Sequence, residues 1–165
     1  MMKKTNCFLY SQQIKDLAKK GATLHKDLPH LPKNWLKNIV KILPYLVLFE
    51  GVFSLTSGLS SLLVFDRDRA WAMHWLKINQ AYYSVTAGFS IILAVFYLLA
   101  YEPLKNKKYE GWLLLFWAII ASLIQSVVLL IMGWGGLFSS LIAALIGFYL
   151  IYEIRPEFIT KKKTK

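Results

Sequence analysis

The acid at position 50 is the residue whose chemistry stands out, because Glu50 interrupts the apolar stretch YLVLFEGVFSL. If this stretch crosses a bilayer as a helix, Glu50 lies on the order of 10 Å inside the span at 1.5 Å per residue. A carboxylate there is costly when ionised, so we expect the acid to be neutral, paired or in contact with water. Glu50 therefore indicates either a site that handles protons or cations, or an acid that locks two helices together. The lack of a second charge inside the spans favours the lock.

Three aromatic residues could lie close to this acid. Counting depth along the other apolar stretches places Tyr97, Trp117 and Tyr149 near the level of Glu50. A tyrosine hydroxyl can donate a hydrogen bond to a carboxylate, which makes Tyr149 a candidate partner.

A second polar group is expected near the middle of another apolar stretch. Gln125 is flanked by Ser122 and Ser126, and this cluster could face Thr86 and Ser90 across a helix interface. A hydrogen bond between membrane helices contributes only about 0.6 to 2 kcal/mol, so we interpret the cluster as packing rather than a substrate site.

The residues that usually bind metals do not form a metal-binding pattern. His25, His30 and His74 fall outside the apolar stretches at spacings that match no metal motif, and we expect them on the surface. The single Cys7 excludes an internal disulfide. We therefore expect no metal, no cofactor and no enzymatic activity, because a lone acid lacks the partners that catalysis normally requires.

Four apolar stretches must position these residues, and each is about as long as a helix needs to cross a bilayer. Pro44 begins the first stretch and suits the first turn of a helix. The sequence therefore predicts an all-α fold, a four-helix transmembrane bundle within residues 43–153. The expected spans are residues 44–65, 80–101, 111–132 and 137–152.

Residues 1–42 are expected to form a basic amphipathic segment at the cytoplasmic membrane surface. Its last part, KNWLKNIVKILP, repeats cations every four residues at Lys33, Lys37 and Lys41. Trp35 suits the headgroup level, and the lysines suit anionic lipid headgroups. The same pattern also fits the first, solvated turns of the first span, and the sequence does not separate the two interpretations.

The net charge of +11 is explained by membrane topology. Both ends of the chain are basic, the loop with Lys105, Lys107 and Lys108 is basic, and the turn GWGG carries no cation. The positive-inside rule then places both termini, including the tail of residues 154–165, in the cytoplasm, and we expect a prokaryotic cytoplasmic membrane. Nucleic acid is not expected as a partner, because only three arginines are present.

Small residues recur four apart in the first two spans. Ser54 and Gly58 match Ser84 and Gly88 at an offset of thirty residues. Small residues at this spacing let membrane helices approach closely, so we expect the first two spans to pack through these faces.

From Ser84 onward the chain resembles the membrane module of bacterial lysyl-phosphatidylglycerol synthase-like proteins. The resemblance is carried by a glycine-bearing span, the basic loop KNKKYEGW (residues 105 to 112), a further hairpin and a last span that ends in RPEF (residues 155 to 158). The segment RDRAW (residues 67 to 71) is similar to that loop as well. The transferase domain of that family is absent from this sequence, so the resemblance implies a lipid-facing or lipid-translocating accessory module.

Two functions are consistent with these features. The first is a small, non-enzymatic membrane subunit that assembles with itself or with another membrane protein through small-residue faces. The alternative is a transporter or channel component for protons, cations or lipid, with Glu50 and Gln125 lining its path.

Overall fold

The computed structural model describes residues 30–63, 80–133 and 137–159, and every element in these ranges is an α-helix. The helices are α2 (Lys33–Leu63), α4 (Gln80–Lys105), α5 (Tyr109–Ile131) and α6 (Leu137–Ile159). All four are long and apolar enough to cross a membrane. The predicted all-α class and the multi-pass architecture are confirmed, whereas the expected segment before residue 30 lies outside the described residues.

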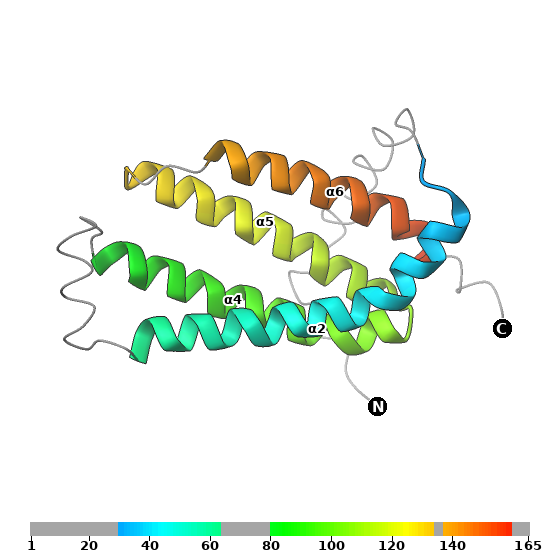
Figure 1. The fold of residues 1–165 in the computed structure, drawn as a ribbon, viewed down its shortest axis with the longest axis horizontal. Helices are drawn as coiled ribbons and strands as arrows, with labels where there is room; N and C mark the ends of the chain where they lie inside the picture. Colours follow the sequence, from blue (N-terminus) through cyan, green and yellow to red (C-terminus); the bar gives the residue numbers. More distant parts are fainter. Residues whose placement is uncertain (1–29, 64–79, 134–136, 160–165) are drawn as a thin grey trace, which may run out of the picture.

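The helices pack in chain order, α2 on α4, α4 on α5 and α5 on α6 (Figure 1). The start of α2, the turn between α4 and α5 and the end of α6 lie together at one end of the molecule. We call this the basic end, because Lys37, Lys41, Lys105, Lys107 and Lys108 belong to it. Helix α2 has few contacts with α6, so one side of α2 is not covered by the other described helices.

Three helix ends lie beyond the boundaries expected for the membrane spans, at the start of α2 and at the ends of α4 and α6. Helix α2 begins at Lys33 rather than at Pro44, so KNWLKNIVKILP forms the first turns of the span, and the buried Pro44 lies inside the helix. A proline there lacks the N–H that would bond the carbonyl four residues earlier, but the helix continues through it. Helices α4 and α6 likewise continue through Pro103 and Pro156. Proline therefore does not mark a helix boundary at any of these positions.

A short turn joins α4 to α5. The N–H of Lys108 donates to the carbonyl of Pro103 at 2.8 Å, and Lys107, at φ 50°, donates to Leu104 at 2.9 Å. This pair of bonds is a Schellman motif, which ends a helix with one residue in the left-handed region. Helix α5 begins at Tyr109, directly after this turn. A Cβ at Gly111 would lie only 2.6 Å from the backbone nitrogen of Leu104. Glycine is therefore required at position 111.

The largest of the fully buried side chains gather toward the basic end. Trp112, Leu104, Leu113 and Ile154 are almost completely buried, and they belong to α4, α5 and α6.

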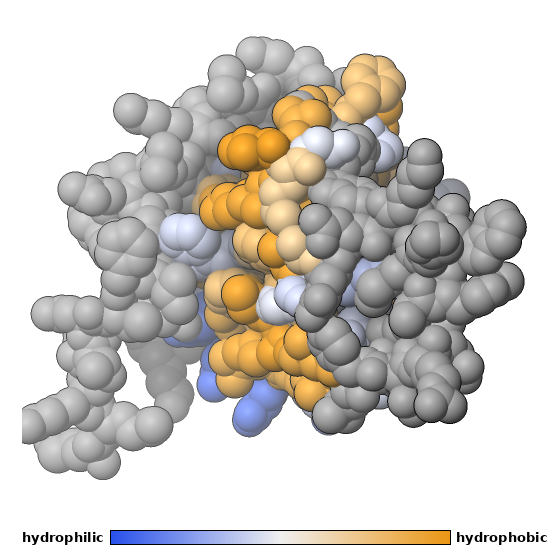
Figure 2. Space-filling view, turned by 90° about the vertical axis from the view of Figure 1, so that its left-hand side faces the viewer, coloured by the Kyte–Doolittle hydropathy of each residue, from blue (hydrophilic) through white to orange (hydrophobic). Residues whose placement is uncertain are grey.

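The surface of the described helices is strongly apolar. Its most exposed large hydrophobic residues are Ile131, Phe138, Phe49, Leu145 and Trp35. Figure 2 views the opposite end, where hydrophobic side chains are interspersed with more polar ones. The exposed hydrophobic residues along the helices fit lipid as the surrounding medium.

Candidate functional site

The contact between α2 and α4 is built on glycines of α2. A Cβ at Gly51 would lie 3.1 Å from the side chain of Leu98, and one at Gly58 would lie 2.8 Å from Ile91. Both glycines are buried, so the two helices approach closely along this line. Gly88 differs, because a Cβ there would meet nothing within 4 Å. The structure thus places Gly58 in the expected contact between the first two spans and places Gly88 outside it.

The hydroxyl groups near this contact bond within their own helices. Ser54 Oγ donates to Glu50 Oε1 at 3.4 Å, and Thr86 Oγ1 donates to the carbonyl of Tyr82 at 2.8 Å. Ser84 is exposed rather than packed against α2. Bonds of this kind satisfy a hydroxyl without a neighbouring helix, so they supply no link between α2 and α4.

Glu50 lies on a part of α2 that the other described helices leave exposed. Its partner among the described residues is Ser54, at a distance that makes only a weak hydrogen bond. Tyr97 packs over the neighbouring Gly51 and is close enough to interact electrostatically with the acid. Trp117 was expected at the same depth. Its indole N–H is buried and donates no hydrogen bond to a described residue. Tyr149 is partly buried and has contacts of its own.

The polar cluster on α5 does not form the expected bridge to α4. Ser122 Oγ donates to the carbonyl of Ile119 at 2.8 Å, and Ser126 Oγ donates to the carbonyl of Ser122 at 2.9 Å. Gln125 is partly buried and has no side-chain hydrogen bond to a described residue. The serines are satisfied inside α5 because a helix carbonyl one turn back is always within reach.

Glu50 and Gln125 also lie at different levels. Gly51 lies beside Leu98, and Leu104 lies beside Gly111, which fixes the register of α2, α4 and α5. In this register Gln125 lies about nine residues beyond the level of Glu50, which is roughly 13 Å along a helix axis. The two side chains therefore do not belong to one compact site.

An interaction that the sequence analysis missed connects the two ends of the described chain. Glu153 is buried, with 5% of the residue exposed, and its Oε1 accepts the backbone N–H of Leu31 at 2.9 Å. His30 Nδ1 lies 3.1 Å from Oε2 of the same carboxylate. His30 is exposed, as expected, but it is not free of contacts. Leu31 precedes α2, so the negative charge also lies where the helix dipole favours it.

An aromatic cluster surrounds Trp112 next to this carboxylate. Tyr109 and Phe116 stack on Trp112, with ring centroids 5.3 and 5.7 Å away, and Tyr152 meets it edge-on. The indole Nε1 donates to the carbonyl of Ile151 in α6. A tryptophan can be fully buried only when its N–H finds an acceptor, and α6 supplies one. The motif KNKKYEGW was noticed for its charge, but its tryptophan is the centre of the core.

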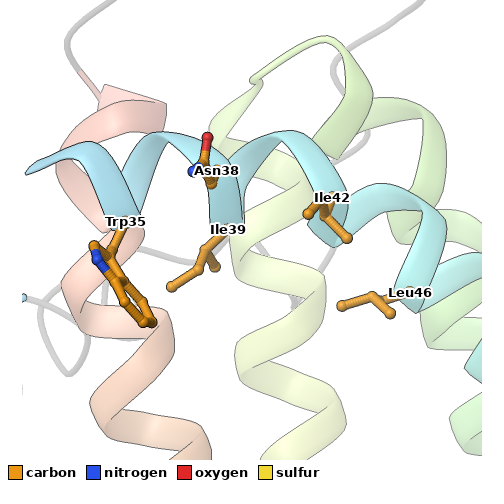
Figure 3. A pocket seen from close by; sticks show the side chains of 5 residues that line it. All are labelled: Trp35, Asn38, Ile39, Ile42 and Leu46. Atoms are coloured by element: carbon orange, nitrogen blue, oxygen red, sulfur yellow. The ribbon is translucent and has the colours of Figure 1, made fainter.

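The face of α2 near its start carries the residues expected at the headgroup level. Trp35 is 65% exposed, and Lys37 and Lys41 are exposed. An open groove of about 370 Å³ runs along this part of the helix, and Figure 3 shows its lining side chains. The groove is lined by Trp35, Asn38, Ile39, Ile42 and Leu46. Its lining is almost entirely apolar, as expected for a surface in contact with lipid chains.

Within the described ranges, no three His, Cys, Asp or Glu side chains gather as a metal site would require. No family model, no curated protein and no solved structure matches the chain.

Proposed function

We propose that this protein is a non-enzymatic membrane subunit that assembles through the exposed side of α2, with a second copy or with another membrane protein. The observation that carries this proposal is the exposure of Glu50 on a helix that crosses the membrane. Contact between a carboxyl group and lipid chains is unfavourable, so such groups are usually covered by protein.

The surface around Glu50 has the form of a helix-packing face. Leu46, Glu50, Phe53 and Ser57 are all exposed and recur every three or four residues, so they form one stripe along α2. The ring of Phe53 stacks on the ring of Phe49 with centroids 6.5 Å apart, so aromatic rings form one side of the stripe. A small residue at Ser57 would let a partner helix approach closely, and a polar group of that helix could satisfy the carboxyl.

The basic end supports a proposal for orientation. Lys37, Lys41 and the turn with Lys107 and Lys108 are all at this end of the bundle. By the positive-inside rule we place this end, and with it both termini, on the cytoplasmic side. Lys37, Lys41 and Trp35 would then rest among headgroups, where lysines attract anionic lipid.

The transporter alternative is less well supported. It requires Glu50 and Gln125 to line one path, but the register of the helices separates them by roughly 13 Å along the bundle. Glu50 is also on the outside of the described helices rather than between them.

Substitution of Glu50 tests assembly directly. The full chain in a mild detergent should elute as a complex, and Glu50→Leu should convert it to monomer while leaving its helix content unchanged, because leucine suits lipid better than a carboxyl does. Glu50→Gln should have a smaller effect, because an amide still forms hydrogen bonds. The matched control is Glu102→Gln at the exposed end of α4. Unchanged assembly in Glu50→Leu, or a monomeric unmodified chain, would reject the proposal.

A further inference from the structure

We propose that Arg155 forms a binding site for the phosphate of an anionic phospholipid at the basic end of the bundle. This site is separate from the exposed side of α2 and does not depend on assembly through Glu50.

The guanidinium of Arg155 is held by aromatic residues. Its Cζ lies 5.4 Å from the centre of the Trp112 ring, a cation–π contact. The rings of Tyr109 and Tyr152 pack on the same indole. These contacts come from both α5 and α6, so the guanidinium has a fixed position between the two helices.

The charge of Arg155 is not balanced by a carboxylate of the described chain. Its Nε is buried and has no hydrogen-bond partner. Glu153 and Glu157 lie two residues before and after it on α6, and side chains at that spacing do not face each other. The carboxylate of Glu153 moreover already has hydrogen-bond partners in the backbone N–H of Leu31 and the ring of His30. A partly buried guanidinium without an anion is unfavourable, so an anion from outside the chain would stabilise this arrangement.

The surroundings favour phosphate as that anion. The turn beside Tyr109 contributes Lys107 and Lys108, and Lys108 is the N-cap residue of α5 and makes no side-chain cap bond. The positive end of the α5 dipole therefore also favours an anion here. A guanidinium binds phosphate oxygens through a planar pair of donors, and nearby lysines add charge without fixed geometry. The cationic groups thus converge where α5 starts and α6 ends.

The position along the bundle favours a lipid as the source of the phosphate. Arg155 lies four residues before the end of α6, about 6 Å along the axis of a helix that is long enough to span the membrane. This is the depth at which headgroups and aromatic side chains meet. Exposed apolar residues such as Ile159 and Leu150 of α6 could contact the acyl chains.

Lipid retention by the full chain tests the site. We would purify the protein in a mild non-ionic detergent, add phosphatidylglycerol or phosphatidylcholine, and count bound lipids by native mass spectrometry. The unmodified chain should retain phosphatidylglycerol in preference to phosphatidylcholine. Arg155→Gln should weaken phosphatidylglycerol binding about tenfold or more, because charged hydrogen bonds are the strong ones. Lys105→Gln, which makes the same change of charge at the end of α4, should have little effect.

Three outcomes would overturn the proposal. The first is unchanged phosphatidylglycerol binding in Arg155→Gln, and the second is an equal loss in Lys105→Gln, which would indicate general attraction to the basic end. The third is release of the lipid by excess inorganic phosphate, which would make free phosphate the ligand. If Arg155→Gln does not fold, Arg155→Lys keeps the charge but loses the planar donor pair, so it should still weaken binding severalfold. Full binding by Arg155→Lys would then count against the site.

Discussion

The carboxylate of Glu153 near the end of α6 accepts the backbone N–H of Leu31, which immediately precedes α2. The two residues are 122 positions apart in the sequence. Helices α2 and α6 otherwise have few contacts, so this bond, with His30, fixes the start of the first span against the last one. The same carboxylate is buried, which makes the bond more valuable than one at the surface.

Removal of this carboxylate should loosen the basic end. We expect Glu153→Ala to reduce the free energy of unfolding by about 1 to 3 kcal/mol, because the N–H of Leu31 loses its acceptor. Glu102→Ala is the control, since Glu102 is an exposed acid at the same end. Thermal unfolding in detergent would measure both variants, and equal stability of the two would contradict the role given to Glu153.

The indole N–H of Trp112 should contribute to the free energy of unfolding in addition to the burial of its aromatic ring. Trp112→Phe keeps an aromatic ring but leaves the carbonyl of Ile151 without its donor, and we expect a loss of about 1 to 3 kcal/mol or more. Trp35→Phe makes the same chemical change at an exposed position and should alter stability by less than about 0.5 kcal/mol. Similar melting temperatures for the two variants would show that the hydrogen bond to α6 is unimportant.

The two glycines at matched positions should respond differently to leucine. Gly58→Leu must push α2 away from Ile91, and overpacking of this kind costs about 1 to 3 kcal/mol. Gly88→Leu places its side chain in open space, so we expect little loss of stability. Circular dichroism during heating in detergent would compare them. A larger effect at Gly88 would mean that α2 and α4 pack through another face.

The single cysteine offers a test of orientation. Cys7 is the chain's one thiol, so a membrane-impermeant maleimide reports the location of the N-terminal segment without further engineering. We expect labelling of everted vesicles and none of intact cells, because the basic end should face the cytoplasm. The reverse pattern would invert the proposed topology.

The apolar stretches were sufficient to predict the four helices, because twenty or so apolar residues have few alternatives to a membrane span. The helix ends were harder. Pro44 is typical of a first turn, yet α2 continues through it, and the lysines at its start extend the same helical pattern. A proline shows that one backbone bond is missing, but it does not show whether packing compensates for that loss.

The interactions at the basic end could not be predicted from the sequence. The bond between Leu31 and Glu153 joins residues that share no periodicity, and the acceptor of Trp112 is a backbone carbonyl, which no residue type reveals. Thr86 and Ser122 lie within helices, but the hydrogen bonds expected between α4 and α5 are not among those of the described residues. Ser122 and Thr86 bond their own helices, because a carbonyl one turn back competes with every distant partner.

Cysteine cross-linking in native membranes tests the central claim that the Glu50 face of α2 meets another protein. In a Cys7→Ser background, Phe53→Cys places a thiol on this face, and Leu145→Cys places one on the exposed side of α6. With a short thiol-reactive cross-linker that also captures nearby amines, Phe53→Cys should give a discrete band of higher mass and Leu145→Cys should not. No band from Phe53→Cys, or equal bands from both variants, would contradict the account.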